Sequence, residues 1–129
     1  MAAGSIFNSI ATFPPGTTIP KPGARAQFKI KGLGERRGER AIIYLIPNHT
    51  DPSRPYQKGV TASEIERAHA QLLLSGRFTR AWFNSELKNA AREGACNFTT
   101  IGGLFELMGI ATYVGDGVYL AATRGNGRE

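Results

Sequence analysis

The residue types that catalysis or metal binding requires are few in this chain and widely spaced. His49 and Asp51 form an H-x-D pattern in PNHTD, a weak signal for a metal ligand or a base, and we interpret His49 as a surface loop residue. His69 falls near the apolar stripe of a predicted helix, where we expect a packed histidine rather than a ligand. Cys96 precedes another predicted helix, a position that stabilises a thiolate. Because Cys96 has no evident histidine partner, we expect a half-buried structural residue.

Longer catalytic motifs are missing from the sequence as well. The chain has no Walker motif, no zinc-ligand spacing and no H-E-x-x-H pair, and its glycines at 32, 34 and 38 do not fit G-x-G-x-x-G. Trp82, Phe83, Phe98 and Phe105 recur at helical spacing, which favours core positions over a base-stacking platform. We therefore predict that the protein is not an enzyme and uses no metal or cofactor.

The basic residues carry a stronger signal because they are unevenly distributed. The 129-residue chain has a net charge of +6. Residues 1–60 contain nine Lys or Arg against three acidic residues, whereas residues 61–129 contain seven of each kind. An excess of this kind in one half of a chain predicts a basic face for a polyanion, with solubility alone as the alternative.

Many of these cations belong to a predicted β-hairpin. Residues 25–31 (RAQFKIK) alternate like a half-buried strand, and residues 41–46 (AIIYLI) are continuously apolar, like a strand covered on both faces. The linking residues 32–40 are polar, glycine-rich and basic, so the hairpin should have a charged tip. A charged edge strand that only resists aggregation is the alternative. The candidate phosphate contacts in this hairpin are Lys29, Lys31, Arg36, Arg37 and Arg40.

The segments around the hairpin are rich in proline. Residues 1–24 contain four prolines and are predicted to form a flexible or extended arm. The apolar residues Ile6, Phe7 and Ile10 of this arm would dock either on a partner or on the protein's own sheet. Residues 47–59 are predicted to be a loop that closes an N-terminal unit of residues 25–60.

Three helices are predicted in the second half of the chain. The first is amphipathic and begins at a capping box, for which TASE and SEIE are both candidates, and it ends at Gly76. The second runs from about residue 79 to 93. The third begins at Asn97 and presents Ile101, Leu104, Phe105 and Met108 on its inner face. We expect short connections between these helices.

A β-hairpin follows the third helix at residues 110–121. If its loop is Gly115-Asp116-Gly117, Tyr113 pairs with Tyr119 and both tyrosines share one face. A two-residue Asp-Gly loop would mix apolar and aromatic faces, so side-chain parity favours the three-residue loop. The remaining residues 123–129 are predicted to be a disordered tail.

The sequence IGGLFELMGIATYVGDGVYLA, within residues 61–122, resembles the winged helix-turn-helix superfamily in its order of apolar helix, strand, D-G tip and aromatic strand. The resemblance covers about half of the chain and implies an α+β fold, with a three-helix winged-helix-like domain after an N-terminal β-hairpin. It also implies that the third helix enters the major groove, that the hairpin wing touches phosphate or the minor groove, and that the second helix begins near the DNA backbone. The site residues that follow from it are Arg77, Arg80, Lys88, Arg92, Asn97, Thr99 and Thr100.

Two functions therefore follow from the sequence. The first is a small DNA-binding protein, used as a transcriptional regulator, that anchors on phosphates of double-stranded DNA and reads a groove with the third helix and the wing. A homodimer is expected because one such domain covers little DNA. The alternative is a protein-protein interaction module, since the third helix contains no Lys or Arg and the wing tip carries Asp116.

The expected location of the protein is the cytoplasm. A single cysteine allows no disulfide within the chain, which fits a reducing compartment. The N-terminus has no export signal, and no stretch approaches the roughly 18 apolar residues of a membrane span. No membrane association is predicted.

Overall fold

Two antiparallel sheets and five helices make up the fold of residues 5–23 and 26–122, which this computed structural model describes. The strands are β1 (Thr18–Ile19), β2 (Phe28–Arg36), β3 (Glu39–Ile46), β4 (Tyr56–Thr61), β5 (Arg77–Thr79), β6 (Ala111–Tyr113) and β7 (Val118–Ala121). The helices are α1 (Ile6–Ile10), α2 (Ala62–Ser75), α3 (Arg80–Glu86), α4 (Lys88–Glu93) and α5 (Cys96–Leu107). The prediction of an α+β fold is confirmed.

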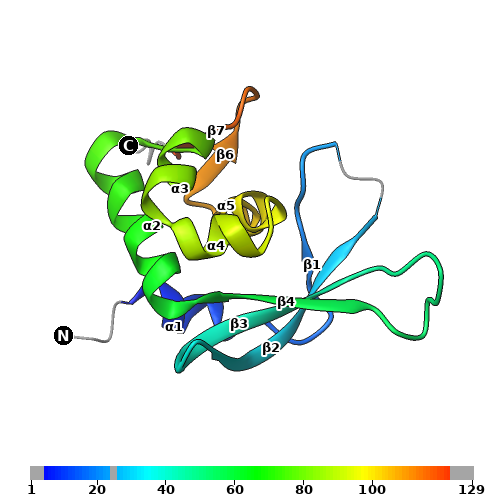
Figure 1. Ribbon diagram of the computed structural model, residues 1–129. Coiled ribbons are helices and arrows are strands. Elements are labelled where there is room, and N and C mark those ends of the chain that lie inside the picture. The colour runs from blue at the N-terminus through cyan, green and yellow to red at the C-terminus, as the bar shows by residue number, and fades with distance from the viewer. Residues whose placement is uncertain (1–4, 24–25, 123–129) are drawn as a thin grey trace.

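The four-stranded sheet has the order β1-β2-β3-β4, and the three-stranded sheet has the order β5-β7-β6. In Figure 1, helices α2 to α5 lie above the four-stranded sheet, whose opposite face points downward. The upper face of this sheet carries the fully buried side chains of Ile42, Tyr44 and Val60. The core therefore lies between the sheet and the helices, and the lower face is left for solvent or a partner.

The N-terminal hairpin has the charged tip that the sequence predicts. β2 and β3 pair up to Arg36 and Glu39, so the turn consists of Arg37 and Gly38 only. Both turn residues have positive φ, 49° and 78°, as a two-residue hairpin turn requires. The strands thus reach further toward the tip than expected, and the long hairpin is confirmed.

The prediction that residues 47–59 form a loop is wrong for its last four residues, which belong to a strand. β4 begins at Tyr56 and pairs with β3 over six residues, which makes β4 an edge strand of the sheet. Pro55 and Gly59 obscure this strand in the sequence, because both residues usually interrupt strands. Pairing with the apolar strand β3 outweighs that local preference.

The expectation of a flexible or extended arm is wrong for the described part of residues 1–24. Ile6, Phe7 and Ile10 are buried on one side of α1, which Ser5 caps and which packs against α2. The Phe7 backbone N–H donates to the Glu66 carboxylate of α2 at 2.8 Å. The apolar residues of this segment therefore complete the protein's own core. Residues 1–4 and the predicted tail 123–129 lie outside the described residues.

Local signals set both ends of α2 as the sequence predicts. The side chain of Thr61 accepts a hydrogen bond from the Glu64 N–H, and the Glu64 carboxylate accepts one from the Thr61 N–H. Of the two candidate capping boxes, TASE is therefore the one that forms, and SEIE is not. Gly76 ends the helix in a left-handed conformation with φ of 80°.

The second predicted helix is interrupted, and a strand precedes it. Leu87 adopts φ −114° and ψ 62°, outside the helical region, and separates α3 from α4. Its side chain is only 2% exposed, and Phe83 and Ala90 on either side are fully buried. Positions 83, 87 and 90 would share one face of a continuous helix as well, so both short helices keep the apolar side that the sequence predicts.

The predicted register of the C-terminal hairpin is confirmed. Tyr113 pairs with Tyr119, and the loop residues Gly115, Asp116 and Gly117 all have positive φ. The buried face is the one that carries Tyr119, which is fully enclosed, whereas Val114 on the opposite face is 55% exposed. This hairpin closes the core with its aromatic side and leaves aliphatic side chains outside.

Candidate nucleic-acid interface

Helix α5, the predicted reading helix, is covered on nearly all sides. Asn97 and Thr100 are fully buried, and Thr99 is half-buried. The Asn97 side-chain amide donates to the Ala90 carbonyl at 2.9 Å, and its oxygen accepts from the Tyr44 hydroxyl. The expectation that these residues point outward is wrong, because the N-terminal segment and the sheet cover the face that a DNA groove would need.

Lys21 is the residue that holds this cover in place. Its ammonium donates to the Thr100 hydroxyl at 2.7 Å, and to the Thr99 hydroxyl and the Cys96 carbonyl at 2.9 Å each. The same nitrogen lies 4.2 Å from the centre of the Phe28 ring. Burial lowers the pKa of the Lys21 ammonium to about 8, with Cys96 opposing this shift and Arg80 adding to it.

Two glycines of α5 allow the close approach of its neighbours. A Cβ atom on Gly102 would lie 2.1 Å from Cζ of Tyr119, and one on Gly103 would lie 2.3 Å from the Pro20 carbonyl oxygen. Both distances are well below van der Waals contact. The glycine pair therefore allows close packing against two different neighbours, Tyr119 and the segment around Pro20, and it explains why the sequence accepts two poor helix formers here.

The outer face of the four-stranded sheet is, by contrast, exposed and basic. Lys29, Leu45 and Gln57 are side-by-side neighbours in register on the face opposite to buried Tyr44. The Lys31 ammonium donates to the Gln57 side chain at 3.2 Å, and the Arg36 guanidinium reaches the Gln57 carbonyl at 3.5 Å. We name Lys29, Lys31 and Arg36 the sheet-face cluster. Within the described part of the chain, none of the three forms an ion pair.

Glycines keep this face flat. A Cβ atom on Gly59 would lie 2.9 Å from Nε of Arg36 and 2.9 Å from Cδ1 of Ile43. A Cβ atom on Gly34 would overlap the side chain of Ile43 at 2.5 Å. The Arg36 side chain therefore lies across the strand at Gly59, where it partly covers Ile43 and keeps its charge at the surface.

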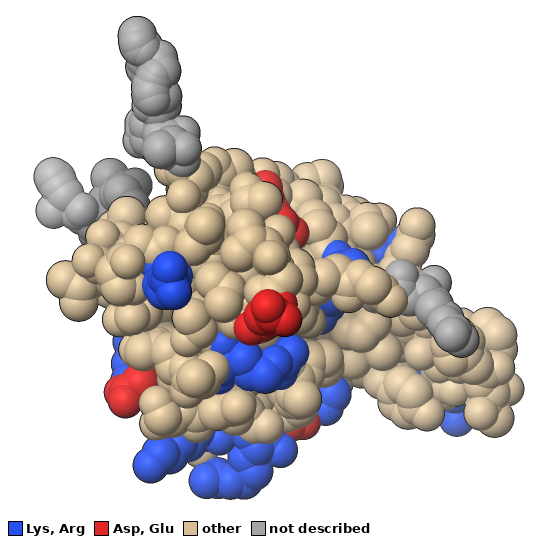
Figure 2. Space-filling model, turned by 90° about the horizontal axis from the view of Figure 1, so that it is seen from above, with Lys and Arg blue, Asp and Glu red and all other residues tan. Residues whose placement is uncertain are grey.

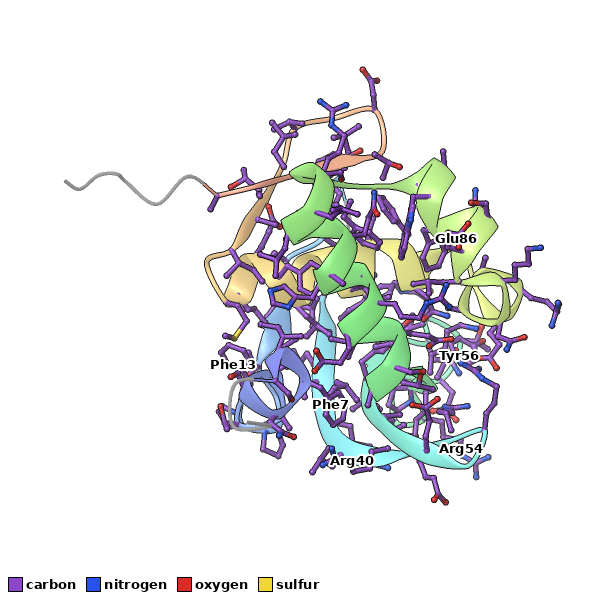
Figure 3. All side chains as sticks on the ribbon, turned by 90° about the vertical axis from the view of Figure 1, so that its left-hand side faces the viewer. Phe7, Phe13, Arg40, Arg54, Tyr56 and Glu86 are labelled. Carbon is purple, nitrogen blue, oxygen red and sulfur yellow. The ribbon has the colours of Figure 1, made fainter. Side chains whose placement is uncertain are left out.

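The other two predicted contacts of the N-terminal hairpin have structural partners. Arg37 forms ion pairs with Glu64 and Glu93, and its hydrogen bond to Glu93 is the main reason that its pKa is raised. The guanidinium of Arg40 lies 5.0 Å from the centre of the Phe7 ring, and both residues are labelled in Figure 3. Arg37 thus joins the hairpin tip to α2 and α4, and Arg40 covers the apolar residues of α1.

The predicted cations of the C-terminal half are divided between two places. Lys88 and Arg92 are exposed on α4, and the Lys58 ammonium of β4 donates to the carbonyl of Glu93 at 2.8 Å. We name Lys58, Lys88 and Arg92 the α4 cluster. Figure 2 shows Lys and Arg side chains gathered along the lower edge of its view, the side on which α3 and α4 lie. Lys58 pairs with Tyr44, so the α4 cluster lies on the helix side of the sheet, and the sheet-face cluster lies on the opposite face.

Arg77 and Arg80 lie apart from these clusters, near the C-terminal hairpin. Arg77 is exposed at the start of β5. Arg80 is half-buried, with its guanidinium 4.6 Å from the centre of the Phe98 ring and its backbone N–H bonded to the Gly117 carbonyl at 2.9 Å. Arg80 therefore supports the hairpin loop, and the exposed residue at the tip of that loop is the acidic Asp116.

The candidate chemical residues form no shared site. His49 is exposed in the loop before β4, and His69 packs with its ring centre 6.0 Å from that of Phe105. Cys96 is half-buried, with its sulfur 3.4 Å from the Tyr44 hydroxyl. No group of three potential metal ligands occurs among the residues that the structure describes. Nor does any helix within those residues combine the length and apolar character that crossing a membrane demands.

The sequence analysis does not identify two residues that matter in the structure. Lys58 belongs to the α4 cluster, and Lys21 belongs to the segment that covers α5. Lys21 was not singled out because it lies among the prolines of the predicted arm, and Lys58 was placed in a loop. Tyr56 and Val60 suit a strand, but Gln57, Lys58 and Gly59 between them break any alternation, so the local signal for β4 is weak. No local signal identifies Lys21, since its partners lie more than 70 residues away in the chain.

Comparisons of the chain with protein-family models, with curated proteins and with solved structures found no match.

Proposed function

We propose that this protein binds double-stranded DNA through phosphate contacts made by the sheet-face cluster. The observation that carries the proposal is the set of three cations on one sheet face, with Lys29 and Lys31 exposed, Arg36 half-buried, and none of them in an ion pair within the described residues. Cations of this kind release condensed counterions when they meet a polyanion, which favours binding without base contacts.

We further infer that α2 to β7 form a winged-helix arrangement. The support is the chain order of helix, strand, two short helices, a third helix and a hairpin, in which β5 pairs with β7 rather than β6. In this protein the third helix α5 is a core element, so we assign DNA contact to a surface that a typical winged helix lacks. A role in transcriptional regulation would follow from DNA binding and remains part of the proposal.

The geometry favours a duplex over a single strand as the ligand. Single-stranded nucleic acids are usually held by aromatic rings on which bases stack. The rings of Phe28 and Tyr44 stack on each other with centres 6.0 Å apart, and Lys21 lies over Phe28 on the covered side of the sheet. The outer face offers ammonium and guanidinium groups, which suit the regularly spaced phosphates of a duplex.

The test is fluorescence anisotropy with a labelled random-sequence duplex at salt concentrations from about 50 to 200 mM. The double variant Lys29→Glu and Lys31→Glu should weaken binding at least tenfold at the lowest salt. Loss of two phosphate contacts should also reduce the slope of log affinity against log salt by about 2 units.

A matched control carries the same change in net charge elsewhere. Arg67 and Arg77 are exposed on α2 and β5, away from the outer face of the four-stranded sheet. The double variant Arg67→Glu and Arg77→Glu should therefore retain most of the affinity. Equal loss in both double variants would show a response to net charge only, and no binding of the wild type at low salt would favour a protein-binding role instead.

A further inference from the structure

A hollow lined mainly by apolar residues lies beside the C-terminal half of α2, away from the Glu64 end that the hairpin tip contacts. It is a cavity of about 500 Å³ between the second half of α2, the end of α5 and the end of β7. Among the described residues, none that lines it is Lys, Arg, Asp or Glu. Figure 3 looks onto this side of the molecule, where α2 crosses the front and Phe13 lies to its left. The lining includes His69, Leu72, Leu73, Met108, Ile110 and Ala121.

Leu73 lines this groove, and Leu74 is its neighbour one residue further along α2. Leu73 on its rim is 70% exposed, and Leu74, the next residue of α2, is 85% exposed. They are the most exposed large hydrophobic residues in the described part of the chain. A helix of a monomeric protein rarely presents two such neighbours to water, because burying each leucine would stabilise the protein by about 1.5–3 kcal/mol.

We propose that this groove and the two leucines form the interface of a homodimer with twofold symmetry. In an isologous interface the same patch serves both partners, so that a projection of each copy fills a hollow of the other. The groove and the leucines supply both halves of such a contact on one surface.

The charge distribution makes this groove the place where a second, equally basic copy can approach with the least repulsion. Each chain carries a net charge of +6, so two copies repel each other wherever their basic surfaces meet. The described lining of the groove carries no charged side chain, and the sheet-face cluster lies on the four-stranded sheet, whose strands do not line the groove. The seven residues after Ala122, TRGNGRE, include no large apolar side chain, so their composition does not suit the groove.

The size of the patch determines the expected strength. One groove of this volume with two leucines forms a patch smaller than the roughly 800 Å² per partner that stable complexes bury. We therefore expect a reversible dimer with a dissociation constant on the order of 10 μM, rather than an obligate one. The inference does not depend on DNA binding.

The experiment is sedimentation velocity on the full chain over roughly 1 to 500 μM, a range that brackets this constant. The mass should rise from 13.9 kDa toward twice that value as concentration increases. Leu74→Glu should raise the dissociation constant at least tenfold, because it places two carboxylates in an apolar contact. Its side chain is almost fully in water, so the far-UV circular dichroism and the melting temperature should remain those of the wild type.

Leu33→Glu is the matched control, since Leu33 is 58% exposed on β2 and takes no part in the groove. It should leave the self-association unchanged. A chain that stays monomeric at the highest concentration overturns the proposal, and so does a dimer that Leu33→Glu weakens more than Leu74→Glu. Binding of another protein at the groove by a strictly monomeric chain would likewise overturn it.

Discussion

Helix α5 and the outer face of the four-stranded sheet contrast in what they do with polar residues. The polar side chains of α5 are buried and satisfied internally, as for Asn97 and Thr100. Those of the sheet face, such as Lys29 and Lys31, stay in water. Asn and Thr in a helix and Lys in a strand are both reasonable DNA contacts by residue type. The difference teaches that tertiary packing decides which of them can reach a ligand.

The physical origin of the contrast lies in the patterns of the two elements. α5 is apolar around most of its circumference, and such a helix is stable only when it is enclosed on all sides. β2 alternates, so one of its faces can pack on the core while the other remains solvated. A typical reading helix would need one polar face, which α5 lacks.

The largest expected effect comes from opening the cover of α5. Gly103→Ala places a Cβ atom 2.3 Å from the Pro20 carbonyl oxygen, so we expect a loss of about 3 kcal/mol in the free energy of unfolding. The sign is informative, because helix propensity alone predicts a gain of about 1 kcal/mol. Urea unfolding measures the change, with Ser85→Ala on exposed α3 as the control. A stabilised Gly103→Ala variant would mean that β1 does not pack on the helix.

The next effect separates a buried asparagine from a DNA contact. Asn97→Ala removes the partner of the Ala90 carbonyl and of the Tyr44 hydroxyl, so we expect a loss of about 2 kcal/mol in the free energy of unfolding. Its affinity for duplex DNA, measured where the variant is folded, should equal that of the wild type. A variant of unchanged stability with weakened DNA binding would return α5 to the role of reading helix.

A smaller effect is the pH dependence that Lys21 imposes. Its pKa is lowered from 10.5 to about 8 in the folded protein, so between these values the unfolded chain binds more protons. Stability should therefore rise with pH from about 7 to 9.5, by several degrees in melting temperature. Burial raises the pKa of Tyr44 and Tyr119, so above about pH 10 the unfolded chain loses protons first and stability should fall again.

Lys21→Met provides the control for this pH profile. The variant keeps the length of the side chain over Phe28 but has no group that titrates in this range. Its melting temperature should change little between about pH 7 and 9.5. A wild-type melting temperature that falls over the same interval would contradict the buried, partly deprotonated state of Lys21.

The smallest expected effect concerns the edge of the exposed face. Arg40→Ala removes a guanidinium that lies over the Phe7 ring, a contact worth about 0.5–1 kcal/mol at an exposed site. Thermal unfolding should detect this loss, while DNA affinity should decrease much less than for Lys29→Glu with Lys31→Glu. A larger loss of affinity for Arg40→Ala than for that double variant would move the proposed interface toward α1.

The features that could be predicted from the sequence are those set by neighbours in the chain. The capping box of Thr61 and Glu64 and the loop of Gly115 to Gly117 involve residues at most four apart. The pairing of Tyr113 with Tyr119 follows from side-chain parity alone. Of the predicted interface, Lys29 and Lys31 are exposed as the strand pattern predicts, and Lys88 and Arg92 are exposed on a helix.

The features that only the tertiary structure decided depend on contacts between distant residues. The cover of α5 joins Lys21 to Thr99 and Thr100 across more than 75 residues, and Arg37 joins the hairpin tip to Glu93 of α4. Nothing in a local window distinguishes an arm that docks on its own helix from one that extends into solvent. The sequence by itself therefore determined the individual elements and their surface charges. Which helix face is enclosed was decided by packing, because the free energy of burying apolar surface depends on what lies opposite it.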